Sequence, residues 1–445
     1  MKYNTIKVTT LILAIVLPLL LFAQNNIITS EKKKQIEDYI NYFETNDQLM
    51  GNVSIFENGK EVINKTFGPK NNADSTKYAV GSITKMFTGV LIAQMFESNK
   101  FDYDEKLSSY FPQVPNSNKI TIKHMLNHTS GLKDYAVKND SLEYWLHDPV
   151  ENEDIIKEII RQGVDFQPGD SLSYSNSAYY LLARILEQKN HKSFKQLVAE
   201  NIANPLDLKN TFGIDENSKQ INFAKSYEKK NSQWQVMEEF YFPNTSGAGD
   251  IISNAHDLNI FIQALFSEQL IKPSTLKKML PVDDDWFGLG IMKAPFHEYI
   301  AYGHGGNSEG TESVTAYNPN NKLAFSYIVN GQKYPNNNKF AKGLLSIIYD
   351  KDFELPEFKE YIPEKSFLEL YKGTYGAEDF PMNIEIYLEE NQLKAQAEGQ
   401  DAFTLTPTKK HIFEFAEGGI EIEFKPFENK FILKQAGQIF ELKKQ

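Results

Sequence analysis

The chain has 445 residues, a formal net charge of −12 and 41% hydrophobic residues, so it is long enough for two domains and apolar enough for a packed core. The acidic balance argues against nucleic acid or an anionic membrane surface as a partner. The absence of cysteine excludes disulfides, cysteine nucleophiles, thiolate metal sites and a lipoprotein anchor. We therefore expect a fold that depends on packing, without a cofactor.

Residues 1–23 have the pattern of a secretory signal peptide. Basic residues precede an apolar run over 11–22, and the small Ala23 offers a cleavage point. The alternative, an uncleaved anchor, is disfavoured because the run is shorter than the roughly 20 residues that span a bilayer and contains Pro18. We expect an exported protein, periplasmic or secreted, with no stable membrane span after processing.

The segment that follows mixes helical and β patterns. A helix capped by Ser30 comes first, and Asn58-Gly59 then joins strands at 53–56 and 62–63 in a hairpin. Residues 103–285 favour short helices and loops. Strands return at 286–292, 298–302, 312–317 and 323–329, and a helix is expected over 341–349. These patterns predict an α+β domain over 24–350, in which strands from both ends form one antiparallel sheet flanked by helices, with a mostly helical second lobe.

A second domain is predicted at the C-terminal end. Residues 351–365 are polar and contain prolines, which is typical of a linker. Residues 366–445 then show short alternating runs separated by turns, at 384–387, 393–395, 403–405, 412–415, 420–424 and 431–433. This pattern predicts a small antiparallel all-β barrel or sandwich.

Ser82 and Lys85 form an S-x-x-K motif at the start of a buried helical run. Three residues is nearly one helical turn, so the two side chains are expected side by side. A lysine in a dry pocket can lose its proton and then accept one from a serine hydroxyl. The helix N-terminus also directs backbone N–H groups at charge that develops near Ser82. The alternative is an N-cap serine followed by a surface lysine.

Tyr174 and Asn176 lie just before another predicted helix. A tyrosine beside a lysine can act as a general base if the positive charge lowers the pKa of its phenol. The Asn176 amide can bind a substrate carbonyl. The alternative is an aromatic residue followed by a helix cap.

Residues 302–307, Tyr-Gly-His-Gly-Gly-Asn, are expected between two strands. Glycines in a strand region often mark a place where a ligand or another backbone comes close. The sequence therefore favours a site at His304, although a lone histidine is more often a packed or surface residue.

Two histidines, His124 and His128, have the i, i+4 spacing that can bind a metal on one helix face. No acidic third ligand is obvious nearby. We interpret the segment as a short helix that ends in a turn at Gly131, and we expect no metal site.

Ser308 lies in a G-x-S-x-G pattern, the nucleophile elbow of α/β-hydrolases. That elbow must leave a strand and enter a helix. Residues 311–317 favour a strand instead, so Ser308 is not expected to be the nucleophile.

The order of Ser82-x-x-Lys85, Tyr174-x-Asn176 and His304-Gly305-Gly306 resembles the serine β-lactamase and penicillin-binding-protein superfamily. The branch most similar to it contains class C β-lactamases, D-aminopeptidases, D,D-peptidases and related esterases. The resemblance covers about residues 30–350 and does not reach the C-terminal β domain. Supporting stretches lie at 79–85, 125–132, 247–253 and 303–310.

The resemblance implies a β-lactamase/transpeptidase-like fold and a serine hydrolase that works through an acyl-enzyme. Ser82 would be the nucleophile, Lys85 its proton acceptor and Tyr174 the general base that passes the proton to the leaving group. Asn176 would bind the substrate acyl amide. The backbone N–H groups of Ser82 and Asn307 would form the oxyanion hole, which contributes about 3–4 kcal/mol per donor in such sites.

His304 stands where the best-known members carry a lysine, and with Gly305 and Gly306 it would line the substrate. A histidine is mostly neutral near pH 7, whereas lysine offers a fixed charge to a carboxylate. The substrate is therefore expected to be an ester, a D-amino peptide or a cell-wall-type peptide. The alternatives are a β-lactamase or D,D-peptidase proper, or a non-catalytic ligand-binding protein on the same fold. The sequence does not predict the oligomeric state.

Overall fold

The computed structural model describes residues 26–445 except 70–72, 74, 139–140, 143–146, 216–217, 219–221, 231–232, 284, 333–336, 359–360, 378–379, 390–391, 401, 416–417 and 436–437. The predicted signal peptide at 1–23 lies outside the described residues. Within the described part of the chain, no helix is both long enough and apolar enough to cross a membrane.

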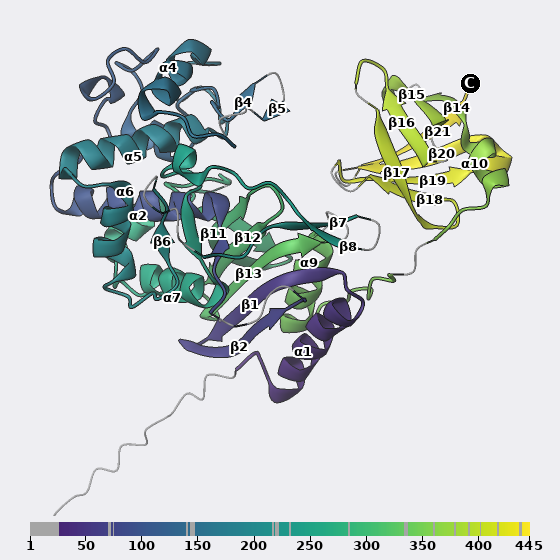
Figure 1. The fold of residues 1–445 in the computed structure, drawn as a ribbon, viewed down its shortest axis with the longest axis horizontal. Coiled ribbons are helices and arrows are strands. Elements are labelled where there is room, and N and C mark those ends of the chain that lie inside the picture. The colour runs from purple at the N-terminus through teal and green to yellow at the C-terminus, as the bar shows by residue number, and fades with distance from the viewer. Residues whose placement is uncertain are drawn as a thin grey trace, which may run out of the picture.

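An eight-stranded sheet forms the centre of the structure before residue 350 (Figure 1). Its strands are β1 (Leu49–Glu57), β2 (Lys60–Phe67), β7 (Tyr227–Lys230), β8 (Gln233–Val236), β10 (Met292–Phe296), β11 (Tyr299–Asn307), β12 (Glu312–Asn318) and β13 (Leu323–Gln332). The main order is β10-β11-β12-β13-β1-β2, all antiparallel, and β7 adds a short parallel pairing to β13. Because β1 pairs with β13, both ends of this segment build one sheet, as predicted.

Two predicted strand boundaries are wrong. Residues 286–291 precede the strand that begins at Met292; the Gly288 N–H donates to the Ile291 carbonyl (2.8 Å) in a turn, and Gly290 has a positive φ of 81°. Residues 303–307 do not lie between strands but complete β11, where Gly303 pairs with Ala316 of β12. The glycines are therefore part of the ladder, and His304 has a fixed place within it.

Helices cover both faces of the sheet (Figure 1). Helices α1 (Ser30–Thr45) and α9 (Asn337–Ile348) pack on one face, and α2 (Thr84–Glu97) and α7 (Ala255–Phe266) belong to the core of the other. Side chains of β13 point alternately to the two faces of the sheet. Phe325 and Tyr327 join the core under α1 and α9, whereas Ala324 and Ile328 join the core that contains α2 and α7. Helix α2 is mostly apolar and is buried over most of its length, as expected for a helix at the centre of a core.

The segment between β2 and β10 is mostly helical, as predicted. Besides α2 and α7, this segment contains the helices α3 (Ile122–Leu126), α4 (Asn152–Gln162), α5 (Asn176–Asn190), α6 (Phe194–Val198) and α8 (Pro273–Met279), with shorter helical turns η2 (Leu107–Ser109), η4 (Ala199–Ala203) and η5 (Phe242–Thr245). A small sheet of order β3-β9-β6 joins β3 (Tyr78–Ala79), β9 (Ile251–Ser253) and β6 (Phe212–Gly213), and a hairpin pairs β4 (Val137–Lys138) with β5 (Ser141–Leu142).

The C-terminal strands form a closed antiparallel barrel, which decides between the two predicted β architectures. A helix, α10 (Lys365–Tyr371), precedes β14 (Gly373–Ala377), β15 (Phe380–Glu389), β16 (Gln392–Ala397), β17 (Phe403–Lys409), β18 (Ile412–Phe415), β19 (Ile420–Lys425), the turn η6 (Pro426–Glu428), β20 (Lys430–Gln435) and β21 (Gln438–Lys444). The first and last strands, which the sequence did not predict, pair with each other and close the barrel. The domain boundaries at 351–365 and 366–445 remain predictions.

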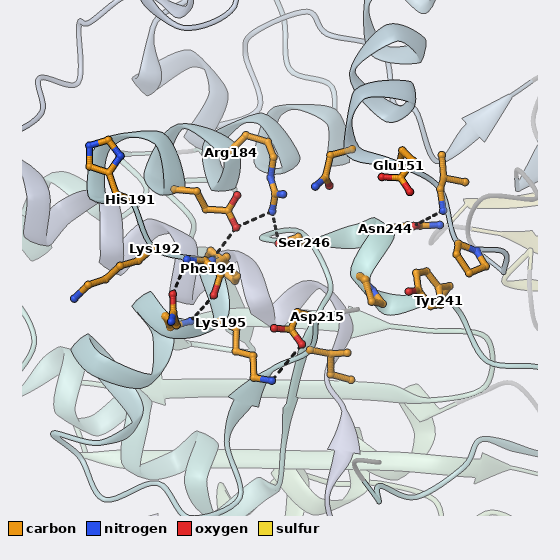
Figure 2. Close-up of a pocket in the computed structure, with 18 residues that line it drawn as sticks. Glu151, Arg184, His191, Lys192, Phe194, Lys195, Asp215, Tyr241, Asn244 and Ser246 are labelled. Carbon is orange, nitrogen blue, oxygen red and sulfur yellow. Dashed lines mark hydrogen bonds and ion pairs between the residues drawn. The ribbon is translucent and has the colours of Figure 1, made fainter. Parts of the chain in front are cut away.

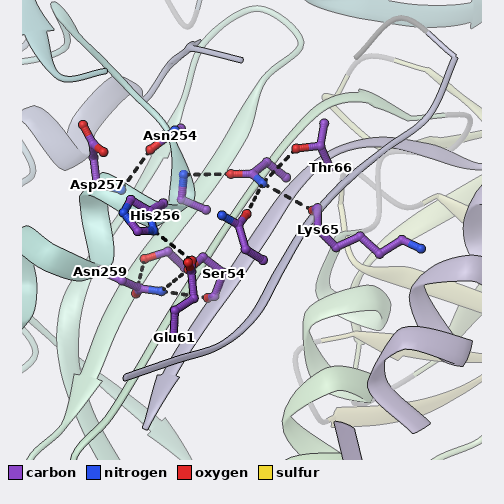
Figure 3. A network of polar contacts seen from close by, with 12 residues as sticks. Ser54, Glu61, Lys65, Thr66, Asn254, His256, Asp257 and Asn259 are labelled. Atoms are coloured by element: carbon purple, nitrogen blue, oxygen red, sulfur yellow. Dashed lines mark hydrogen bonds and ion pairs between the residues drawn. The ribbon is translucent and has the colours of Figure 1, made fainter. Parts of the chain in front are cut away.

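A buried polar network attaches α7 to the sheet (Figure 3). The Asn259 amide nitrogen donates to the Ser54 carbonyl (2.8 Å) and hydroxyl (3.0 Å), and the Ser326 hydroxyl donates to Asn259 Oδ1 (2.7 Å). These three residues are fully buried. Since a buried polar group without a partner costs free energy, the network specifies one position of α7 over β1 and β13.

We predict that Asn259→Ala lowers the free energy of unfolding by about 2–3 kcal/mol, because the Ser54 carbonyl and hydroxyl and the Ser326 hydroxyl each lose one of their buried hydrogen bonds. Denaturant unfolding followed by tryptophan fluorescence reports this segment alone, since none of the three tryptophans lies beyond residue 350. Gln263→Ala is the matched control on the same helix, because the Gln263 side chain bonds only the Asn259 carbonyl among the described contacts. Equal, small losses in both variants would contradict the prediction.

Candidate functional site

Ser82 lies in a tight turn, η1 (Gly81–Ile83), that leads directly into α2. Gly81 has a positive φ of 50°, and a Cβ there would come 2.8 Å from the backbone nitrogen of Asn307. A Cβ at Gly306 would likewise come 2.8 Å from the backbone nitrogen of Ser82. Because neither glycine carries a Cβ, β11 approaches the Ser82 turn backbone to backbone, and the nitrogens of Ser82 and Asn307 lie close together.

Lys85 is fully buried one helical turn after Ser82. Its ammonium nitrogen has three acceptors: Ser82 Oγ at 3.1 Å, Asn176 Oδ1 at 2.7 Å and the Ala248 carbonyl at 2.8 Å. An ammonium group has three donors, so the side chain is held at every N–H direction. The alternative of a surface lysine is therefore wrong.

Burial lowers the pKa of Lys85 to about 7, because the apolar surroundings disfavour the charged form; the nearby Asp134 carboxylate acts in the opposite direction. At neutral pH a large fraction of Lys85 is then the free amine. This is the form that can accept a proton from Ser82.

Asn176 connects Lys85 to Asp134. Its amide nitrogen donates to Asp134 Oδ2 (2.8 Å), its backbone N–H donates to the same oxygen (3.2 Å), and its Oδ1 accepts from Lys85. Asp134 Oδ1 accepts the Ala136 N–H (3.0 Å). Ser175 caps α5 by accepting the Ala178 N–H, which fixes the chain that carries Asn176.

Tyr174 lies against the same pair. Its hydroxyl forms a hydrogen bond with Ser82, the Lys85 nitrogen lies 4.8 Å from its ring centroid, and the His128 ring stacks on it at 4.3 Å. Burial raises the pKa of the Tyr174 phenol, which is opposite to the direction expected from the sequence. In the resting site Tyr174 is thus a neutral phenol, and Lys85 is the group with a pKa near neutrality.

His304 points into the site from β11, with its ring centroid 6.4 Å from that of Tyr174, and only 5% of the residue is exposed. Its Nδ1 contacts the Gly305 carbonyl. Burial, reinforced by the positive charge of Lys85, lowers the pKa of His304 to about 4. The imidazole is therefore neutral at physiological pH.

His124 and His128 do not share one helix face. Helix α3 ends at Leu126, so His128 lies beyond it, in a positive-φ conformation. His124 Nδ1 accepts the Thr121 N–H (3.3 Å), and His128 Nδ1 accepts the Ser175 N–H (3.2 Å). Within the described part of the chain, no group of three or more potential ligands is positioned to hold a metal ion.

Ser308 lies in the turn between β11 and β12, where its N–H donates to the Thr311 carbonyl (2.9 Å). The residues after it enter a strand, not a helix, as the sequence predicted. The geometry is therefore not that of a nucleophile elbow.

Sequence reasoning missed two residues of this site. Asp134 lies just beyond the stretch 125–132 that supported the resemblance, and its acidic side chain has no characteristic spacing to Asn176. Ala248 lies within the stretch 247–253, but it acts through its carbonyl, which no side-chain pattern can reveal.

A cavity of about 530 Å³ opens beside α5 and α6, and none of the predicted site residues lines it (Figure 2). Three of its basic groups form ion pairs: Arg184 with Glu187 (3.1 Å), Lys195 with Asp215 (3.2 Å) and Lys192 with Glu200.

A family model described as Beta-lactamase matches residues 44–346, about two thirds of the chain. The chain is 29% identical over 283 residues to the putative penicillin-binding protein PbpX of Bacillus subtilis, covering 61% of this chain and 68% of PbpX. It is 26% identical over 260 residues to a teichoic acid D-alanine hydrolase of Staphylococcus aureus, covering 56% and 61% of the two chains.

Among solved structures, the D-amino acid amidase from Ochrobactrum anthropi SV3 superposes with a TM-score of 0.64 at 19% identity, covering 72% of this chain and 99% of the amidase. This likeness shows the fold. The chain spans 61–68% of the length of the two curated relatives. The family match includes every residue from Ser82 to Asn307 described above.

Proposed function

The chain belongs to the β-lactamase family, and on that premise we propose that it is an exported serine hydrolase that cleaves an ester or amide bond through an acyl-enzyme on Ser82. One observation carries the proposal: a fully buried Lys85, with a pKa of about 7, lies 3.1 Å from the Ser82 hydroxyl. A serine becomes nucleophilic when a base of this kind accepts its proton.

In the proposed reaction, Ser82 Oγ bonds to the substrate carbonyl carbon while its proton passes to the Lys85 amine. The carbonyl oxygen takes up the negative charge, and the N–H groups of Ser82 and Asn307 stabilise it. The intermediate then collapses: the carbonyl re-forms and the C–O or C–N bond to the leaving group breaks. The neutral Tyr174 hydroxyl, which bonds Ser82, donates a proton to the leaving alcohol or amine, and the Lys85 ammonium returns a proton to the phenolate. Water then hydrolyses the acyl-enzyme by the reverse sequence of proton transfers.

The neutral His304 supports a substrate without a carboxylate at that end of the site. The relatives agree with this, because their names describe hydrolysis of teichoic acid D-alanine and of D-amino acid amides. We therefore favour a D-aminoacyl ester or amide. A β-lactamase or D,D-peptidase is the second candidate, and the penicillin-binding name of PbpX is the observation that favours it.

The proposal predicts that a fluorophosphonate probe labels Ser82, as located by mass spectrometry of the digested protein, and that Ser82→Ala abolishes both labelling and turnover of p-nitrophenyl esters. EDTA should leave the activity unchanged. Labelling at Ser308, or no labelling, would contradict the proposal. If the parent protein shows no turnover and Ser82→Ala binds ligand with the same affinity as the parent, the protein is a binding protein and not an enzyme. A panel of short esters, D-aminoacyl amides, D-Ala-D-Ala peptides and nitrocefin then ranks the substrate classes.

We predict that His304→Lys raises acylation by nitrocefin about tenfold relative to a neutral ester, because the new side chain supplies a cation for the β-lactam carboxylate. The measurement is the ratio of the two kcat/KM values, which cancels general losses of activity. His304→Gln is the matched control, since it replaces the imidazole without adding charge and should keep the parent ratio. An unchanged ratio in His304→Lys would mean that this position does not face the substrate carboxylate.

A further inference from the structure

Asp134 is a charged residue of the site that takes no part in the proposed reaction, yet its carboxylate is nearly saturated with hydrogen bonds. It accepts from the backbone N–H of Ala136 (3.0 Å), the backbone N–H of Asn176 (3.2 Å) and the Asn176 amide (2.8 Å). Two of these three donors belong to the residue that also contacts Lys85. Through these hydrogen bonds Asp134 holds Asn176, and Asn176 in turn accepts a hydrogen bond from Lys85.

The Asn176 amide has one orientation that satisfies both neighbours. Its nitrogen faces the Asp134 carboxylate, and its oxygen faces the Lys85 nitrogen (2.7 Å). The opposite orientation would set two donors against each other at Lys85 and two acceptors against each other at Asp134. Asp134 accordingly fixes which end of the amide Lys85 meets.

That orientation determines where the Lys85 lone pair points. A neutral amine has two N–H donors and one lone pair, and the structure offers it three neighbours: Asn176 Oδ1, the Ala248 carbonyl and Ser82 Oγ. The first two are pure acceptors and take both N–H groups. The lone pair is then directed at Ser82, whose hydroxyl is the one neighbour that can donate.

We propose that Asp134 is a positioning residue that aims the lone pair of Lys85 at Ser82, acting through Asn176. The inference rests on the proposed acyl-enzyme mechanism, in which Lys85 accepts the Ser82 proton. Asp134 itself touches neither Ser82 nor the reacting atoms, so its effect is exerted through the amide.

The backbone around Asp134 is built to hold this arrangement. The segment 128–136 runs beside 173–177: the Ser173 N–H donates to the His128 carbonyl (2.9 Å), and the Tyr135 N–H donates to the Ser177 hydroxyl (2.9 Å). The Ser177 hydroxyl in turn donates to the Lys133 carbonyl (2.6 Å). Contacts on both sides of Asp134 thus keep its carboxylate in register with Asn176.

Asp134 also has a distinct electrostatic place. The titratable groups that face Lys85 are Asp134 from the loop before β4, His128 from the loop after α3, Tyr174 before α5, Tyr179 within α5 and His304 from β11. Burial lowers the pKa of both histidines and raises the pKa of both tyrosines, so these four are neutral near pH 7. Among them Asp134 alone can bring a negative charge that favours the Lys85 ammonium.

The test is the rate of fluorophosphonate labelling of Ser82 against pH, in the full chain and in Asp134→Asn. The parent rate should rise through the pKa of Lys85, about 7, as the amine forms. At pH values above this rise, the probe should label Asp134→Asn about 10- to 100-fold more slowly than the parent, because the Lys85 lone pair is no longer directed at Ser82. The pH at which its labelling rate rises should also be about one unit lower than in the parent, because removal of the carboxylate disfavours the ammonium form of Lys85.

Asp165→Asn is the matched control. Asp165 is an exposed carboxylate bonded to the same loop, where its N–H donates to the Gly131 carbonyl and its side chain pairs with Lys133 (3.2 Å). This variant should keep the parent rate and its pH dependence. If Asp134→Asn does not fold, Asp134→Glu replaces it: the charge remains while the amide is displaced, so labelling should slow with an unchanged pH dependence.

A double-mutant cycle with Asn176→Ala separates positioning from general support. Because Asp134 acts through Asn176, Asp134→Asn should slow labelling much less in the Asn176→Ala background than in the parent. Equal losses in the two backgrounds would overturn the inference. In Asp134→Asn, either parent-like labelling or slower labelling with an unchanged pH dependence would also overturn it. If the parent itself is not labelled at Ser82, the proposed function fails, which is a different outcome from failure of the inference alone.

Discussion

The site around Ser82 depends on Lys85, a lysine that hydrogen bonds hold in place while burial disfavours its charged form. Lys85 is fully buried, yet each of its N–H directions meets an acceptor. Burial of an unpaired ammonium is costly, and one response is a lower pKa. Here the desolvation exceeds the attraction of Asp134, and the pKa falls to about 7. The same packing that buries α2 thus produces a base beside Ser82.

A second constraint brings the parts of the site together. Ser82 lies in the turn before α2, Asn176 begins α5, and His304 lies in β11, so three segments that are distant in the sequence meet at one site. The approach of β11 to the Ser82 turn requires glycine at Gly81 and Gly306, since a Cβ at either would clash with the opposite backbone. Glycine therefore has a packing role here, and the close backbones provide the two N–H groups that the proposed oxyanion hole needs.

Much of this could be predicted from the sequence because the signals were local. The hairpin at Asn58-Gly59, the alternation in the barrel strands and the S-x-x-K spacing all reflect contacts between near neighbours. The rest depends on distant residues. The carboxylate of Asp134 and the carbonyl of Ala248 form part of the site only because the fold brings them to Asn176 and Lys85. The pKa of the Tyr174 phenol is raised, chiefly by burial, which depends on residues that are distant in the sequence.

The most direct test of the account is the ionisation of Lys85 itself. In protein labelled with ¹³C at the lysine ε-carbons, the Lys85 signal is identified by its absence in Lys85→Arg and is followed by NMR as the pH is changed. We expect an apparent pKa near 7 for this one lysine. A Lys85 signal that titrates near 10.5, the ordinary value for lysine, would contradict it, because Ser82 would then face an ammonium group that cannot accept its proton.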